Sequence, residues 1–231
     1  MQAPLRICAV VPALDCGATI TGVVEGIREQ GVSLVLVVDD GSSDDTAARA
    51  EAAGATVLRH ASNLGKGHAL VTGFRWALER GHERILTIDA DGQHDPREIP
   101  RLLSAAEEAD LVVGRRRIMP GAMPLSSLIG NVTSLFWVSL FSGRLCFDAQ
   151  CGYRVYSRRL LDQVPLEGGR FETETELLLR AMRLALPVSW APVRTIYPRG
   201  AHPRRTNFRV SSDPLRVIGV VLRSLRYPRA R

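Results

Sequence analysis

The sequence predicts an α/β protein with a largely parallel sheet, and three observations support that prediction. Short apolar runs alternate with amphipathic helical segments through the first half of the chain. The apolar runs are continuous, which is typical of strands covered on both faces of a parallel sheet. A chain of 231 residues, with 45% hydrophobic and 23% charged residues, is long enough to bury the core of one domain.

The first half contains five predicted strands, at residues 6–12, 33–38, 54–58, 85–88 and 111–113. Helices are expected between them, at residues 19–30, 46–53, 69–80 and 96–109. Thr19 or Thr21 can cap the first helix, and Pro96 occupies a favoured first-turn position in the last. Repeated strand–helix units of this kind give a parallel sheet flanked by helices.

The second half has a different character. Residues 118–124 are predicted to form a loop, and residues 126–143 contain no charged side chain. The polar residues within 126–143 argue against a membrane-spanning helix. They favour a helix in the membrane interface, with a buried or dimer-contacting helix as the alternative.

Four further elements are expected towards the end of the chain: helices at residues 157–163 and 172–184, a strand at 188–196 interrupted by Pro192, and a helix at 213–225. The helix at 213–225 is apolar and flanked by arginines. It is predicted either to lie on a membrane surface or to pack on the domain.

The charge pattern points to an anionic partner. The net charge is +6, Lys66 is the only lysine, and residues 194–231 contain ten arginines and one acid, Asp213. Such a basic segment suits a phosphorylated substrate, a membrane surface or a nucleic acid. No zinc-ligand pattern or RNA-binding signature is present, so nucleic acid is the least favoured.

The cysteines and the N-terminus predict a cytoplasmic protein. The four cysteines form no Cys-x-x-Cys pair and lie in or near apolar runs, as expected for buried free thiols. The N-terminal residues have no pattern of a signal peptide.

An acidic turn directly after residues 85–88 is the main candidate for chemistry. Asp89 and Asp91 are two residues apart, and Gly92 lets the backbone bend at once. Carboxylates at the carboxyl end of a strand lie where α/β sheets bind ligands, and Mg²⁺ or Mn²⁺ prefers oxygen ligands. A metal site for a nucleotide diphosphate is therefore one interpretation. The other is an acidic turn in which Asp95 caps the next helix.

Two further polar loops follow predicted strands and can meet the same ligand. They are Asp39-Asp40-Gly41-Ser42 and Gly65-Lys66-Gly67. Lys66 does not have the Gly-x-x-x-x-Gly-Lys-Ser/Thr spacing of a P-loop, and no Gly-x-Gly-x-x-Gly turn follows the first strand. An ordinary dinucleotide site is therefore not expected.

Five motifs in order resemble family 2 glycosyltransferases of the GT-A fold. The motifs are Val37–Thr46, Asn63–Gly67, Asp89–Pro96, Gln150–Arg154 and Phe171–Glu174. Within that family the chain is most similar to dolichol-phosphate mannosyltransferases and polyprenyl-phosphate glycosyltransferases. The resemblance implies one Rossmann-like GT-A domain, with a nucleotide-sugar-binding part at 1–117 and an acceptor-binding part at 118–231.

The resemblance also implies roles for individual residues. Nucleotide-sugar binding falls to Pro12, Asp15, Asp39, Asp40, Gly65, Lys66, Asp89, Ala90, Arg204 and Arg205. Asp89, Asp91 and Gln93 would hold Mg²⁺ or Mn²⁺. Acceptor binding falls to Arg115, Arg117, Asn131, Gln150 and Gly152. The implied catalytic residues are Asp91, Arg154 and Glu174.

The implied reaction is metal-dependent, inverting transfer of a hexose from a GDP- or UDP-linked sugar. The expected acceptor is a polyprenyl or dolichyl phosphate, whose oxygen is already anionic, so no strong base is needed. If the acceptor is a sugar hydroxyl of a glycan or glycolipid, Glu174 is the candidate base. Leu14 and Cys16 replace the family's usual tyrosine and glutamate, which leaves the nucleotide open.

Two other interpretations remain at this point. A sugar-1-phosphate nucleotidyltransferase would need a glycine-rich loop with Arg or Lys near the N-terminus, and residues 11–18 contain neither. A non-catalytic nucleotide-sugar-binding subunit is the second alternative. The resemblance also implies peripheral association with the cytoplasmic membrane face, and a homodimer is compatible with the uncharged helix.

Overall fold

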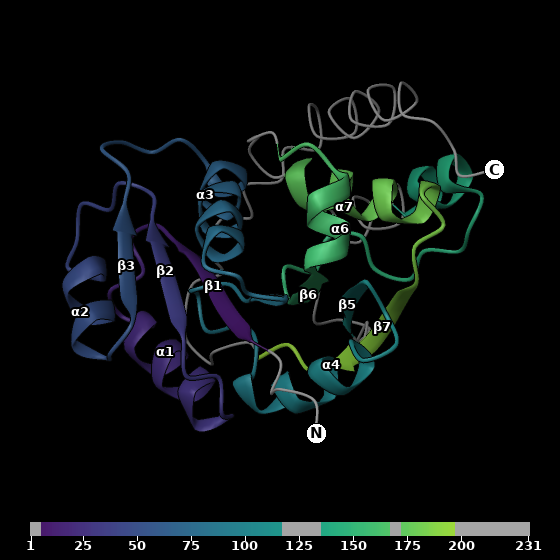
Figure 1. Ribbon diagram of the computed structural model, residues 1–231. Coiled ribbons are helices and arrows are strands. Elements are labelled where there is room, and N and C mark those ends of the chain that lie inside the picture. Colours follow the sequence, from purple (N-terminus) through teal and green to yellow (C-terminus); the bar gives the residue numbers. More distant parts are fainter. Residues whose placement is uncertain (1–5, 117–134, 167–171, 197–231) are drawn as a thin grey trace.

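The computed structural model describes residues 6–116, 135–166 and 172–196 (Figure 1). Within these ranges one seven-stranded sheet has the strand order β3-β2-β1-β4-β6-β5-β7. The strands are β1 (Ile7–Ala13), β2 (Val35–Asp39), β3 (Thr56–Arg59), β4 (Arg84–Thr87), β5 (Leu111–Arg116), β6 (Arg154–Ser157) and β7 (Val188–Val193).

Helices cover the two faces of this sheet. They are α1 (Ile20–Glu29), α2 (Thr46–Ala52), α3 (Lys66–Glu79), the 3₁₀ helix η1 (Pro96–Glu98), α4 (Ile99–Ala105), α6 (Arg158–Gln163) and α7 (Glu172–Arg183). Residues 135–142 are also helical. In Figure 1, α3, α6 and α7 lie above the sheet, while α1 and α4 lie below it.

The sheet is parallel except for β6. β1 pairs in parallel with β2 and β4, and β5 pairs in parallel with β7. β6 runs antiparallel between β4 and β5, so that Val155 lies opposite both Leu86 and Val112. The predicted α/β class with a mostly parallel sheet is therefore confirmed. β6 and β7, from the second half of the chain, complete the same sheet as β1 to β5.

The structure changes several predicted boundaries. β6 was not predicted, because only Val155 and Tyr156 are apolar between its polar ends. The predicted helix at 96–109 divides into η1 and α4 and ends at Ala105. The predicted interruption at Pro192 is wrong, since β7 continues to Val193. Proline is tolerated there because β7 is the last strand in the described sheet order.

The core is formed by the central strands and the apolar faces of the helices. β2 is buried along its whole length, and α1 buries Ile20, Val23, Val24 and Ile27. All four cysteines are buried and free, as the sequence predicts. Burial raises the pKa of Cys8, Cys146 and Cys151 to about 12.

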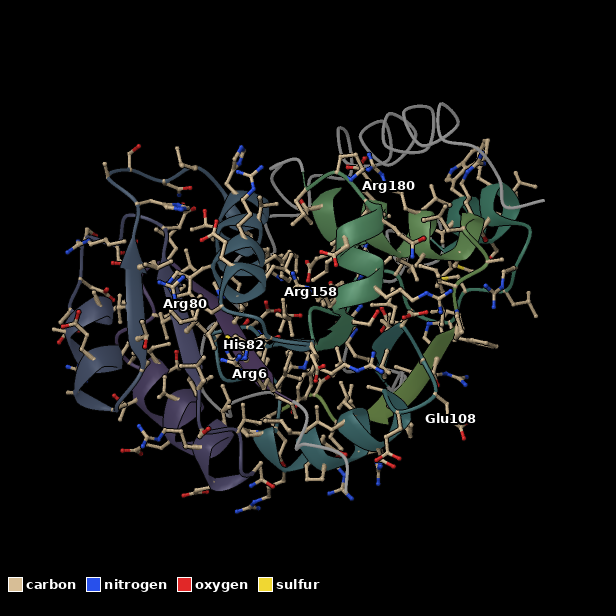
Figure 2. All side chains as sticks on the ribbon, viewed as in Figure 1. Arg6, Arg80, His82, Glu108, Arg158 and Arg180 are labelled. Carbon is tan, nitrogen blue, oxygen red and sulfur yellow. The ribbon has the colours of Figure 1, made fainter. Side chains whose placement is uncertain are left out.

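The amino ends of the strands carry basic and titratable groups. Figure 2 shows Arg6 and His82 next to each other, from the residues just before β1 and β4. Burial, together with Arg6, lowers the pKa of His82. The polar groups described below lie at the opposite, carboxyl ends of β1, β2 and β4.

Some sequence predictions lie outside the described residues. These are the helix at 213–225, most of the helix at 126–143, and Arg117, Asn131, Arg204 and Arg205. Among the helices that the structure does describe, none is long and apolar enough to cross a membrane.

Candidate active site

The turn after β4 gathers charged groups from three parts of the chain. The Lys66 Nζ atom, in the first turn of α3, lies 2.6 Å from Asp89 Oδ1 and 3.0 Å from Glu174 Oε2. Glu174 comes from the first turn of α7 and follows Asp89 by over 80 residues in the chain. The Nε2 atom of buried His94 lies 3.7 Å from Asp89 Oδ2. One lysine therefore joins two carboxylates that the sequence separates widely.

Asp91 stands beside this cluster and differs from Asp89. Its Oδ1 accepts a hydrogen bond from the Gln93 backbone N–H at 2.9 Å, which closes the turn. Burial and the neighbouring Asp89 raise the pKa of Asp91. Burial would also raise the pKa of Asp89, but attraction to Lys66 and His94 holds it below its usual range.

The Asp89–Asp91 pair fits a hard divalent cation. Within the described ranges, no group of three or more His, Cys, Asp or Glu side chains is arranged as a metal site. Mg²⁺ is typically held by one or two carboxylates together with substrate phosphates and water. Asp89 and Asp91 are two half-buried carboxylates on one tight turn. They match that mode of binding if substrate phosphates supply further ligands.

The second acidic pair, at the end of β2, is used differently. Asp40 accepts hydrogen bonds from His60 Nδ1 at 2.7 Å, Leu64 N at 3.0 Å and Gly65 N at 2.7 Å. Asp40 therefore fixes the loop that leads into Lys66. Asp39 is fully buried, and its Oδ1 accepts from Ser42 N at 2.9 Å.

The loop between β1 and α1 is tied to the loop after β2. Asp15 Oδ1 accepts from Ser43 N at 2.8 Å, and Asp15 has a left-handed backbone with φ of 50°. The Cys16 N–H donates to Thr46 Oγ1 at 2.8 Å. Pro12 and Ala90 are both buried, and the Ala90 carbonyl accepts from Thr19 Oγ1 at 2.6 Å. These contacts hold the loops after β1, β2 and β4 together.

Gly152 brings a backbone segment into contact with the charged cluster. A Cβ atom at this position would lie 2.7 Å from both Asp89 Oδ2 and Lys66 Nζ. The Gly152 carbonyl accepts from Thr87 Oγ1, the last residue of β4, at 2.9 Å. A side chain at this position would displace the Asp89 carboxylate and the Lys66 ammonium, which explains the motif glycine in physical terms. Gln150 lies two residues before it in the same loop.

Arg154 is fully buried at the start of β6. Its guanidinium donates to the backbone carbonyls of Cys151 at 2.6 Å, Glu174 at 2.6 Å and Ala149 at 2.8 Å. It thereby links the loop before β6 to the first turn of α7. These contacts hold backbone in place.

The consecutive arginines at the end of β5 separate by strand alternation. Arg116 turns inward and pairs with Asp148, with its Nε 2.9 Å from Oδ2. Arg115 is exposed, and its guanidinium lies over the Phe147 ring at 4.9 Å. The structure therefore does not bring Arg115 into the charged cluster around Lys66.

Several exposed apolar side chains follow one another between residues 136 and 147. Phe136 is 58% exposed and Leu140 55% exposed, and their spacing places them on one face of the helix at 135–142. Leu145 is 74% exposed and Phe147 45% exposed, on the chain just after that helix. These four exposed apolar residues are called the apolar ridge, and the last of them, Phe147, lies under the Arg115 guanidinium.

Sequence reasoning placed Asp89, Asp91, Gln93, Lys66, Glu174 and Gly152 in one site, and the structure brings them together. It missed His94, although that residue lies inside the quoted Asp89–Pro96 motif. It also missed the Arg116–Asp148 pair. Alternation along β5 would have separated Arg116 from its neighbours, but its partner could be identified only in three dimensions.

Comparisons with known proteins agree on one family. Residues 8–164 match the family described as glycosyl transferase family 2. The undecaprenyl-phosphate mannosyltransferase of Micrococcus luteus is 35% identical over 170 residues, covering 69% of this chain and 70% of the relative. The UDP-N-acetylglucosamine–dolichyl-phosphate N-acetylglucosaminyltransferase of Methanococcus voltae is 29% identical over 222 residues, covering 86% and 88%.

Solved structures agree as well. One is glucosyl-3-phosphoglycerate synthase from Mycobacterium tuberculosis, crystallised with Mn²⁺, UDP-glucose and phosphoglyceric acid. It has a TM-score of 0.73 and 25% identity, over 97% of this chain and 81% of that one.

Proposed function

Because the chain belongs to glycosyl transferase family 2, we propose that it moves a hexose from a GDP- or UDP-linked sugar to a polyprenyl or dolichyl phosphate, with inversion at the anomeric carbon. One observation carries this proposal: Asp89, Asp91, Lys66, Glu174 and Gly152 meet at the carboxyl end of β4. That is where a mostly parallel α/β sheet binds its ligands.

The donor side is assigned to the acidic turn. Asp89 and Asp91, with Gln93, would hold Mg²⁺ or Mn²⁺, which when bound supplies positive charge to the leaving diphosphate. The Mn²⁺ and UDP-glucose in the structural neighbour support this choice. Asp39 and Asp40 border the nucleoside. Asp40 acts through the loop that it holds, which ends at Gly65 and Lys66.

Lys66 and Glu174 face the reacting groups. Lys66 provides a fixed positive charge beside the acidic turn that contains Asp89 and Asp91, and this charge is suited to a phosphate oxygen. Glu174 is buried and ion-paired to Lys66. A phosphate acceptor carries its own anionic oxygen and needs no strong base. The site only has to position that phosphate and offset its repulsion from the donor diphosphate. The lipid-phosphate acceptors in the names of two relatives support the same choice.

Arg154 is assigned a positioning role, in place of the catalytic role that the family resemblance implies. Its guanidinium donates three hydrogen bonds to backbone carbonyls of the described residues, and its side chain is fully buried. Arg204 and Arg205 are assigned to the diphosphate. The chain approaches that position at Ile196, whose N–H donates to the Gln93 carbonyl at 2.8 Å.

Acceptor delivery is assigned to the membrane surface. We assign the apolar ridge of Phe136, Leu140, Leu145 and Phe147 to the lipid interface, with Arg115 beside it for anionic headgroups or the acceptor phosphate. The enzyme would then be peripheral at the cytoplasmic face. Flotation with anionic vesicles tests this assignment. A dimer in gel filtration without vesicle binding would instead assign the ridge to a second copy.

A specific observation favours one second candidate, a sugar hydroxyl as acceptor. Glu174 Oε1 is buried and has no hydrogen-bond partner within the described residues. That oxygen could accept the proton of a hydroxyl acceptor. In that case activity should require no lipid phosphate.

The test is a transfer assay with a panel of UDP- and GDP-sugars. Each donor is incubated with Mn²⁺ and with undecaprenyl phosphate, undecaprenol or soluble sugars, and products are identified by mass spectrometry. A hexosyl-phosphoryl lipid formed from one donor supports the proposal. Transfer only to undecaprenol or soluble sugars would assign the hydroxyl reaction. Metal-dependent nucleotide binding without turnover would indicate a non-catalytic subunit.

A further inference from the structure

A buried carboxylate outside the charged cluster organises the loop that forms one wall of the site. Asp148 is 6% exposed. Its Oδ1 accepts from the backbone N–H groups of Gln150 and Cys151, both at 3.0 Å. Arg116 donates two hydrogen bonds to the same carboxylate, with Nη2 3.0 Å from Oδ1 and Nε 2.9 Å from Oδ2. One side chain thus joins the end of β5 to the turn at 148–152.

That turn is also fixed at its far end. The Gly114 N–H donates to the Tyr153 carbonyl at 2.8 Å, and the Tyr153 hydroxyl donates to the Asp95 carbonyl at 3.2 Å. Thr87 holds Gly152, where a Cβ atom would lie 2.7 Å from both Asp89 Oδ2 and Lys66 Nζ. A shift of the turn by a fraction of an ångström would therefore change the shape of this wall of the site.

The same turn controls Arg154 and, through it, Glu174. The carbonyls of Ala149 and Cys151 accept two of the Arg154 hydrogen bonds, and the Glu174 carbonyl accepts a third. Asp148 orients the turn, the turn orients Arg154, and Arg154 holds the start of α7. We infer that Asp148, paired with Arg116, is a positioning residue for sugar transfer that sets the acceptor side of the site.

This inference rests on the proposed transferase function and names a residue to which the family motifs gave no role. Asp148 does not reach the charged cluster, so nucleotide binding should not depend on it. A misplacement of about 1 Å by a supporting residue can cost on the order of 10²-fold in rate. The expected signature is a loss in turnover and acceptor affinity with donor affinity retained.

The experiment compares Asp148→Asn with a matched control, Asp110→Asn. Asp110 is 7% exposed at the opposite end of β5, and it accepts from Ser157 Oγ at 2.6 Å and pairs with Arg159 at 3.3 Å. Both variants remove one buried carboxylate charge next to an arginine. Thermal midpoint, Mn²⁺-dependent nucleoside diphosphate binding by calorimetry, and kcat and KM for transfer to undecaprenyl phosphate are measured for each.

We expect both variants to lower the thermal midpoint. Asp148→Asn should in addition reduce kcat by roughly ten- to a hundredfold and raise the acceptor KM, with the diphosphate Kd within about twofold of the parent. Asp110→Asn should keep the parent kcat. Equal kinetics in the two variants would overturn the inference.

Arg116→Gln serves if Asp148→Asn does not fold. It leaves the bonds from Asp148 to Gln150 and Cys151 in place, so its loss of kcat should be smaller but in the same direction. Parental kcat and acceptor KM in a folded Arg116→Gln protein would then count against the inference. A parent enzyme that binds no nucleotide with Mn²⁺ and transfers no sugar would instead refute the proposed function, and the inference with it.

Discussion

The two acidic pairs at the carboxyl ends of β2 and β4 look alike in the sequence and differ in the folded protein. Asp39 and Asp40 are buried, and Asp40 accepts three hydrogen bonds from a side chain and two backbone groups of the following loop. Asp89 and Asp91 are only partly buried, and Asp89 lies 2.6 Å from the Lys66 ammonium and 3.7 Å from the His94 ring. The Asp39–Asp40 pair holds the loops around the site in place, whereas the partly exposed Asp89–Asp91 pair can contact a ligand.

The difference arises from spacing and from the local turn. Asp39 and Asp40 are adjacent, so strand alternation sends one towards the Ser42 turn and the other towards Leu64 and Gly65. Asp89 and Asp91 are separated by Ala90 and followed by Gly92 with φ of 73°. That turn keeps both carboxylates at the end of the strand. The same residue type therefore supports structure or chemistry according to its neighbours.

The largest expected effect comes from Asp91→Asn. Removing one of the two carboxylate charges should lower sugar transfer by at least about 10²-fold, because the proposed metal site loses a ligand. The thermal midpoint should change little. Product formation from the preferred donor at saturating Mn²⁺ measures this.

A cap in the same turn supplies the control for Asp91→Asn. Asp95 accepts from Arg97 N at 3.0 Å at the start of η1. Asp95→Asn should keep the parental rate. A comparable loss of rate in both variants would show that any change in this turn disrupts the site, and would count against a specific role of Asp91.

Lys66→Met should give the next largest effect. It leaves the carboxylates of Asp89 and Glu174 without the ammonium that lies within 3.0 Å of each. We expect a loss of activity of tens of fold and a loss of stability of about 1–3 kcal/mol. Kinetics and chemical denaturation measure both. If Lys66→Arg performs no better than Lys66→Met, the role of Lys66 is not one of charge.

Asp40→Asn should act mainly on stability and on donor affinity. The amide can replace only part of the acceptor capacity that Asp40 offers to His60, Leu64 and Gly65. We expect a loss of about 1–2 kcal/mol in the free energy of unfolding and a severalfold rise in donor KM, with kcat largely kept. A loss of kcat as large as that of Asp91→Asn would contradict the assignment of Asp40 to loop structure and of Asp91 to the reaction.

The smallest effect is expected at the thiols. Cys8, Cys146 and Cys151 are buried with pKa values raised to about 12, so they remain protonated and unreactive between pH 7 and 9. Iodoacetamide treatment of the native protein, followed by peptide mass spectrometry, should leave all three unmodified and the transfer rate unchanged. Rapid labelling of Cys151 would indicate that the turn at 148–152 opens, and rapid labelling of Cys8 or Cys146 would indicate that the core around that residue opens.

The sequence predicts the parallel half of the fold well, because continuous apolar runs such as Val35–Asp39 have few alternatives. It also predicts the position of the acidic turn, because Asp89 and Asp91 closely follow a buried strand. β6 could not be predicted, since its strand pairing depends on β4 and β5 and not on its own polar ends. The buried contacts of Arg154 and Asp148 likewise depend on backbone carbonyls and N–H groups brought together from distant segments.

Calorimetric titration of UDP and GDP, with and without Mn²⁺, tests whether the turn after β4 holds the metal. We expect Mn²⁺ to tighten nucleotide binding by at least about tenfold in the parent protein and in Asp40→Asn, and Asp91→Asn to lose this gain. An equal gain in Asp91→Asn would show that the turn after β4 does not hold the metal.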